Sequence, residues 1–384
     1  MSGLRSALLV PVLTAFLLGI APAQEPGSQG AEPTFTSDAD LASALEPIRA
    51  RRKVPGIVAG IVRGDRLAVV AAVGIRKVGD DTPITVNDKL HLGSCTKAMT
   101  ATLLAKLIEQ SRLRFDSTIG EVFGDLHKEL HPGFQNVTLE QLLTHRAGLP
   151  ANTDWRDLGN GSLIEQRAQV LKRVLVKPPV HPPGTKHLYS NVGYVIAGHM
   201  AEEVTGRLWE DLMKEMLFTP LDMPSAGFGP PGTKDQIDQP WGHQLVLGKQ
   251  VPYQADNAAA LGPAGTVHCT LADWGRFASL HLAGAQGDST FLSPETIRTL
   301  QTAAPGEPRY AGGWLVTERD WAGGRALTHA GSNTMWFATV WIAPARNHVF
   351  LAVTNQGGDA GAKACDDVIE VLIKRAASSP APPP

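Results

Sequence analysis

Segments with the composition of β-strands lie towards the two ends of this 384-residue chain, and the long middle between them has helical periodicity. Residues 56–62 and 67–73 are rich in Val, Ile and Ala and flank the polar turn 63–66, which predicts a β-hairpin. Comparable strand-like runs near the C-terminus are residues 313–317, 335–342 and 349–354. Strands from both ends are therefore expected to share one antiparallel sheet.

The middle of the chain, from about residue 96 to residue 300, is predicted to form a mainly helical insertion. Apolar residues recur there at the spacing of one helix face. Thr138 and Gln141 have the spacing of a capping box, and the Gly-Leu-Pro sequence at 148–150 is expected to end that helix.

Two further helices are predicted to flank the sheet, one at about residues 38–51 and a terminal one that ends in Lys374 and Arg375. The expected fold class is α/β (α+β), an antiparallel sheet with terminal helices and an inserted helical subdomain. One domain is expected to cover residues 38–376. Its cleft, between sheet and insertion, is the expected place for a site.

The first 23 residues have the features of a secretory signal peptide. Arg5 precedes an apolar run at 7–21, and Ala21-Pro22-Ala23 has the small-x-small pattern of a cleavage site. At about 15 residues the run is shorter than the roughly 20 that cross a bilayer. We therefore expect cleavage after Ala23, export to the periplasm or medium, and no membrane span in the mature chain.

Composition and charge indicate the nature of the terminal segments and of the binding partners. Residues 24–37 and 377–384 are rich in Pro and polar or small residues, which predicts a flexible lead-in and a disordered tail. A formal net charge of −2, without a basic stripe, gives no case for nucleic-acid binding. No feature of the sequence indicates an oligomeric state.

Three cysteines are too few for a disulfide framework in a chain of this length. One bridge, between Cys269 and Cys365, is conceivable, and Cys95 is expected to be a small buried thiol. His127 and His131 are four residues apart, but no HExxH pattern or carboxylate set surrounds them. Neither a metal nor another cofactor is expected.

Ser94 and Lys97 form the first chemical motif, Ser-x-x-Lys, at the start of a predicted helix. Residues three apart share a helix face, so the Lys97 amine can reach the Ser94 hydroxyl. Burial would favour the neutral amine, which can act as a base. Free N–H groups at the helix start can hold an oxyanion. Alone, the motif has the simpler interpretation of a helix-start serine and a solvated lysine.

Two more motifs follow at long intervals. Tyr189-Ser190-Asn191 precedes a predicted helix, and its phenol and amide can both face one cleft. A lysine nearby would make the Tyr189 phenol easier to ionise, which suits a proton relay. His329-Ala330-Gly331 is predicted at a strand edge, where the small residues would let a substrate lie along the strand. The next residue, Ser332, offers an N–H as a second oxyanion donor.

In this order and spacing the three motifs resemble those of the serine β-lactamase and penicillin-binding-protein-like superfamily. The similar branch contains class C β-lactamases, D-Ala-D-Ala carboxypeptidases, D-aminopeptidases and esterases. The resemblance covers roughly residues 35 to 376.

The resemblance implies a role for each motif residue. Ser94 would be the nucleophile, Lys97 its activator and Tyr189 a proton shuttle, with the resting base left open between the last two. Asn191 would donate to the substrate, and His329, Ala330, Gly331 and Ser332 would form the opposite wall, with the Ser94 and Ser332 N–H groups as oxyanion hole.

The implied substrates are a small-molecule ester, a β-lactam or a short D-amino-acid peptide. Class C β-lactamases usually have Lys where this chain has His329, which favours esterase or peptidase activity over β-lactamase activity. A non-enzymatic alternative remains, in which the same fold serves as a covalent penicillin sensor or a scaffold.

Overall fold

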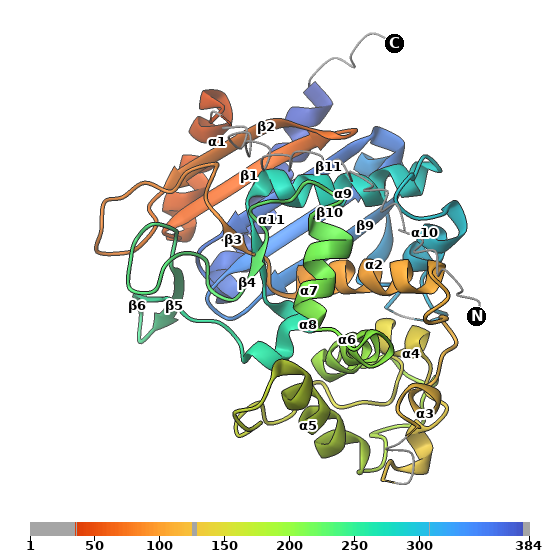
Figure 1. Ribbon diagram of the computed structural model, residues 1–384. Helices are drawn as coiled ribbons and strands as arrows, with labels where there is room; N and C mark the ends of the chain where they lie inside the picture. The colour runs from red at the N-terminus through yellow and green to blue at the C-terminus, as the bar shows by residue number, and fades with distance from the viewer. Residues whose placement is uncertain (1–34, 36, 125–128, 307, 379–384) are drawn as a thin grey trace, which may run out of the picture. The chain divides into compact units, whose positions relative to one another are not determined.

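A six-stranded antiparallel sheet joins the two ends of the chain in the computed structural model (Figure 1). In sheet order the strands are β2 (Arg66–Gly74), β1 (Gly56–Arg63), β11 (His348–Thr354), β10 (Phe337–Ala343), β9 (Gly324–Ser332) and β8 (Leu315–Arg319). Strand β1 pairs with β11 from Ile57 opposite Thr354 to Arg63 opposite His348. The predicted sheet from both chain ends is confirmed.

The structure describes residues 35, 37–124, 129–306 and 308–378. These belong to a compact unit that begins at Thr34. The predicted signal peptide at 1–23 and nearly all of the lead-in lie outside the described residues, as does the tail beyond Ser378. The last helix, α11 (Gly358–Ser378), includes the first two residues of that predicted tail.

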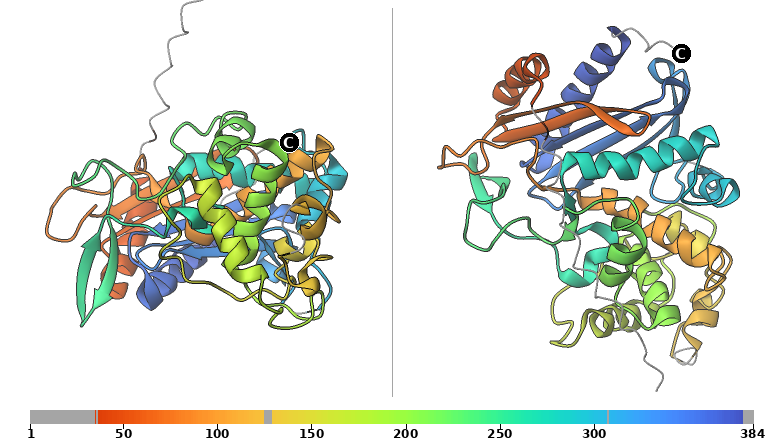
Figure 2. Two further views of the ribbon diagram at one scale, coloured as in Figure 1. Left: turned by 60° about the horizontal axis from the view of Figure 1, so that its bottom comes forward. Right: turned by 45° about the horizontal axis from the view of Figure 1, so that its top comes forward.

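Helices cover both faces of the sheet, so its central strands are buried on both sides. Helices α1 (Ala39–Arg52) and α11 pack on one face, and α9 (Leu271–Gln286) packs on the other (Figure 2). Side chains of β1 alternate between the two cores: Ile57 and Ile61 face α1 and α11, whereas Val58 and Val62 face the larger core around α9. This double burial explains why the strands are apolar throughout.

The insertion contains most of the other helices. In chain order they are α2 (Thr96–Glu109), α3 (Ile119–Val122), α4 (Leu139–Leu143), α5 (Leu163–Leu175), α6 (Asn191–Thr205), α7 (Trp209–Met213) and α8 (Gly262–Gly265), with α10 (Pro294–Gln301) after α9. Short strands accompany them: β3 (Leu90–His91), which precedes α2, forms one sheet with β4 (Gly227–Phe228) and β7 (Val267–Cys269), and β5 (Gly242–Val246) pairs with β6 (Lys249–Tyr253). The insertion is thus less purely helical than predicted.

Three local expectations have mixed outcomes. The capping box of Thr138 and Gln141 is present at the start of α4. The prediction that this helix runs to 148–150 is wrong, because it ends at Leu143, before His145 adopts a left-handed φ of 59°. Strand β8 begins at Leu315 instead of 313, because Gly313 has a φ of 84° that a strand does not allow.

All three cysteines are free and buried. Cys269 lies in β7 and Cys365 in α11, so the conceivable bridge between them is not formed. The prediction of a buried Cys95 thiol is confirmed. Within the part of the chain that the structure describes, no helix is long and apolar enough to span a bilayer.

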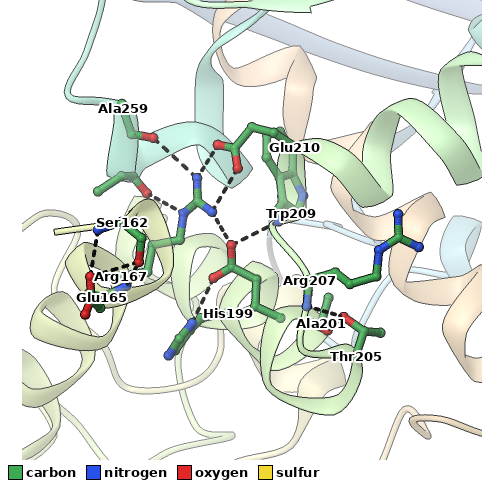
Figure 3. A network of polar contacts seen from close by, with 12 residues as sticks. Ser162, Glu165, Arg167, His199, Ala201, Thr205, Arg207, Trp209, Glu210 and Ala259 are labelled. Carbon is green, nitrogen blue, oxygen red and sulfur yellow. Dashed lines mark hydrogen bonds and ion pairs between the residues drawn. The ribbon is translucent and has the colours of Figure 1, made fainter.

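A buried ion cluster ties the helices of the insertion together (Figure 3). The fully buried guanidinium of Arg167, on α5, donates to Glu202 on α6 and to Glu210 on α7. Glu202 also accepts from the backbone N–H of Trp209 at 3.0 Å and contacts His199 Nδ1 at 2.9 Å. The cluster therefore fixes how α5, α6 and α7 sit relative to one another.

Candidate active site

Ser94 lies in a short 3-10 turn, η1 (Gly93–Cys95), that leads directly into α2. Two glycines let this turn press against the end of β9. A Cβ atom on Gly93 would lie 2.3 Å from the Ser332 nitrogen, and one on Gly331 would lie 2.0 Å from the Leu92 carbonyl oxygen. This close backbone contact thus places Ser94 beside β9, although the two are far apart in the sequence.

The Lys97 amine is fully buried and points back to Ser94. Its Nζ donates to Ser94 Oγ at 3.1 Å, to Asn191 Oδ1 at 2.8 Å and to the Ala264 carbonyl oxygen at 2.6 Å. All three partners are uncharged. Burial lowers the pKa of Lys97 from 10.5 to about 7, so neutral amine is available near neutral pH.

Tyr189 completes the set on the other side of the nucleophile. The centroid of its ring lies 4.8 Å from Lys97 Nζ. Burial raises the pKa of the Tyr189 phenol above its usual value, and its hydrogen bond with the Ser94 side chain acts in the opposite direction. The phenol is therefore protonated in the resting site. The three groups predicted from distant motifs do converge.

His145 supports Tyr189 from behind, and sequence reasoning gave it no role. The two rings are 4.4 Å apart between centroids, and His145 Nδ1 accepts from the Ser190 N–H at 3.1 Å. Ser190 in turn caps α6, since its Oγ accepts from the Gly193 N–H at 3.0 Å. The cap fixes the entry into α6, whose first residue is Asn191.

Asn191 uses both ends of its amide. Its Oδ1 accepts from Lys97 Nζ, so its Nδ2 points away and donates to Asn152 Oδ1 at 2.9 Å. The predicted donor group is thus present in the pocket wall, and it holds the loop of Asn152.

The motif at His329 lies on β9, just beyond the stretch that pairs with β8, which ends at Thr328. His329 itself is 5% exposed, and its Nε2 contacts the Tyr310 hydroxyl at 2.9 Å. Burial lowers the pKa of His329 to about 3, so the imidazole is neutral. The His329 side chain therefore packs beneath β9 against Tyr310. Ala330 is exposed, and Gly331 is the contact point for η1.

A pocket of about 240 Å³ opens at Ser94. Its lining residues are Ser94, Asn152, Trp155, Asn191, Asn257, Ala258, Leu261, Ala264, Gly265, Ser332, Asn333 and Thr334. All are uncharged, and the polar ones are amides and hydroxyls. Of the predicted wall on β9, Ser332 is among them, whereas the His329 side chain is buried against Tyr310.

Sequence reasoning missed several residues that line this pocket. Asn333 directly follows the predicted Ser332 and was within reach of the motif argument. Trp155 and Asn257 lie in loops whose positions no local pattern indicates.

No group of three or more His, Cys, Asp or Glu side chains in the described ranges is arranged to hold a metal ion. His127 lies outside these ranges. His131 accepts a hydrogen bond from the Gly133 N–H at 3.1 Å through Nδ1.

Comparison with known proteins agrees with this architecture. A family model described as Beta-lactamase matches residues 41–372. Penicillin-binding protein 4 of Amycolatopsis lactamdurans is 26% identical over 340 residues, which are 82% of this chain and 84% of that protein. A putative D-alanyl-D-alanine carboxypeptidase of Escherichia coli O157:H7 is 24% identical over 340 residues, 78% of this chain and 77% of the relative.

Among solved structures, the octameric penicillin-binding protein homologue from Pyrococcus abyssi has the same fold. Its TM-score is 0.71 at 24% identity, over 87% of this chain and 77% of that one. Since the family model matches most of the residues, the chain belongs to the Beta-lactamase family.

Proposed function

We propose that this protein is a serine hydrolase that forms a covalent acyl-enzyme on Ser94 and cleaves an ester or amide. Family membership supports the reaction class, and one observation carries the assignment of the nucleophile: the 3.1 Å contact from the buried Lys97 amine to Ser94 Oγ. A neutral amine at this distance can take the hydroxyl proton as Oγ attacks a carbonyl carbon.

The steps follow from the contacts. Ser94 Oγ bonds to the carbonyl carbon and its proton passes to Lys97. The carbonyl oxygen becomes an oxyanion, which we assign to the Ser94 and Ser332 N–H groups; the close contact of η1 with β9 supports this assignment. Tyr189, still protonated, donates its proton to the leaving group and regains one from Lys97. Water then releases the acid by the reverse route, with Lys97 and Tyr189 as one coupled base.

We further propose uncharged esters or amides as the preferred substrates, within the class C β-lactamase-like branch. The amides and hydroxyls that line the pocket suit neutral hydrogen-bonding groups, and His329 is neutral and buried. Hydrolysis of β-lactams or of peptides ending in D-Ala, as the names of relatives suggest, would place a carboxylate here without a cationic partner.

We also propose that the protein is exported. The support is the charged, apolar and small-residue pattern of residues 1–23.

Labelling with a fluorophosphonate tests the nucleophile. The wild type is expected to gain the mass of one probe, whereas Ser94→Ala gains none and loses at least about 10³-fold in kcat on a p-nitrophenyl ester, because the catalytic groups act as a unit. Ser43→Ala is the matched control, since Ser43 is an exposed serine on α1 outside the site. Equal labelling of wild type and Ser94→Ala would refute the assignment.

Three substrates measured side by side define the reaction: a p-nitrophenyl ester, nitrocefin and a D-Ala-D-Ala peptide. We expect the highest kcat/KM for the ester. A stable acyl-enzyme with penicillin and no turnover of any substrate would instead identify a covalent sensor.

A further inference from the structure

A second buried polar network, built on His91 and Asp256, contacts the residue that precedes Ser94. His91, the last residue of β3, is fully buried, and its Nε2 lies 2.8 Å from Asp256 Oδ2. The side chain of Asp256 is 4% exposed. Asp256 lies in the loop that follows β6, 165 positions after His91 in the sequence. None of the catalytic steps above uses either side chain.

The hydrogen bonds define the protonation of the imidazole. The Gly93 N–H donates to His91 Nδ1 at 3.1 Å, so Nδ1 carries no proton. The ring proton is therefore on Nε2, and it is donated to Asp256. In this way the carboxylate selects the tautomer, and the tautomer holds the N–H of the residue that precedes Ser94.

The same carboxylate also reaches the other side of the oxyanion hole. Asp256 Oδ1 accepts from Asn333 Nδ2 at 3.0 Å. Asn333 Oδ1 accepts from the N–H groups of Met335 and Trp336, at 3.2 and 3.1 Å, which closes the turn after Ser332. One buried carboxylate is thus connected to both peptide segments that carry the oxyanion donors.

We propose that His91 and Asp256 are positioning residues that hold the Ser94 and Ser332 N–H groups in one fixed geometry. This rests on the proposed function of Ser94. Oxyanion donors stabilise a transition state only if they are aligned before the charge develops. Gly93, in the left-handed region at φ 51°, and the turn at Asn333 would otherwise be free to relax.

Asp256→Asn tests the proposal with a nearly isosteric change. The new amide has one acceptor oxygen, so it can accept from His91 or from Asn333 but not from both. If the oxygen faces His91, the turn at Asn333 loses its acceptor, and if it faces Asn333, His91 must lose its partner or adopt the other tautomer. In that tautomer Nδ1–H faces the Gly93 N–H, two donors in opposition. We expect kcat to fall about 10- to 100-fold with KM nearly unchanged, the range for a misplaced catalytic geometry. The dissociation constant of an arylboronic acid, which mimics the tetrahedral intermediate on Ser94, should rise by the same factor.

Asp273→Asn is the matched control. Asp273 is a buried carboxylate on α9 that accepts from the Ser225 N–H at 2.8 Å and pairs with Arg276. Its loss should lower the melting temperature without changing kcat or boronate affinity. If Asp256→Asn behaves in the same way, the role of the dyad is structural and the proposal is wrong.

A second pair of variants keeps the test open if Asp256→Asn folds poorly. His91→Asn and His91→Leu both remove the contact with Asp256, but only Asn offers a δ-position oxygen to the Gly93 N–H. We expect His91→Asn to recover most of the kcat and boronate affinity that His91→Leu loses. Equal loss in both would contradict the proposal. Fluorophosphonate labelling of Ser94 in the wild type is the separate check on the proposed function.

Discussion

Two fully buried basic side chains in the insertion, Lys97 and Arg167, have opposite kinds of hydrogen-bond partners. Arg167 contacts two carboxylates, Glu202 and Glu210. Lys97 has three uncharged oxygen partners, and burial lowers its pKa to about 7. A buried charge is tolerated when it is paired, and otherwise the group shifts towards its neutral form.

The difference separates a structural region from a reactive one. In the Arg167 cluster a guanidinium is paired with carboxylates and holds three helices together. The amine beside Ser94 is poised between two protonation states near neutral pH, as a general base requires.

Lys97→Arg would give the site a cation of the Arg167 kind. Arginine keeps its proton at any pH a protein tolerates, so it cannot accept one from Ser94. We expect kcat/KM for a p-nitrophenyl ester at pH 8 to fall at least about 10³-fold, by analogy with the loss of one member of a catalytic unit. Because this cation would be buried without a carboxylate partner, circular dichroism checks that the variant is folded, and Lys97→Met, which removes the amine without adding a charge, should lose the same activity. Activity within tenfold of wild type would rule out Lys97 as the base.

Arg167→Met would leave Glu202 and Glu210 buried without their partner. Breaking a buried ion pair in this way costs about 3–5 kcal/mol in the free energy of unfolding. Urea denaturation measures this loss. The matched control is Arg207→Met, which breaks the exposed pair with Glu215 and should cost less than about 1 kcal/mol. Equal effects of the two changes would mean that the cluster does not stabilise the helices.

The pH dependence of kcat/KM should show a smaller change than these substitutions, about tenfold per pH unit. Only the neutral Lys97 amine is reactive, so kcat/KM should reach a plateau above about pH 7 and fall about tenfold per pH unit below it. The free energy of unfolding should also increase with pH because of Lys97. Between pH 7 and 10.5 the unfolded chain binds the lysine proton that the folded chain lacks, so the free energy of unfolding rises with pH. Lys97→Met should abolish this contribution, whereas a profile that falls with rising pH would contradict the assignment.

Local patterns were enough for the elements whose contacts are local. The hairpin predicted at 56–62 and 67–73 is formed by β1 and β2. Ser94 and Lys97 are in contact because residues three positions apart lie on the same side of a helical turn. Tyr189 could be placed beside them only through the family resemblance, because its contact spans the chain.

The parts that could not be predicted depend on tertiary packing. His329 looked like a cleft residue, but packing against Tyr310 buries it. The contact of His91 with Asp256 joins residues 165 positions apart, and neither residue has a neighbour pattern that marks it. Similarly, the early end of α4 follows from the left-handed His145, whose ring is needed behind Tyr189.

The pairing of β1 with β11 has a consequence for the order of events during synthesis. The nucleophile leaves the ribosome before the helical insertion, but the strand that brings Ser332 to it, and β11, which pairs with β1, are translated only after the insertion. Pairings between such distant segments form slowly, because the intervening loop must close first. Until β9, β10 and β11 have paired, the chain therefore has its serine and lysine but lacks the proposed oxyanion site, and a chain that ends before β9 is expected to be inactive.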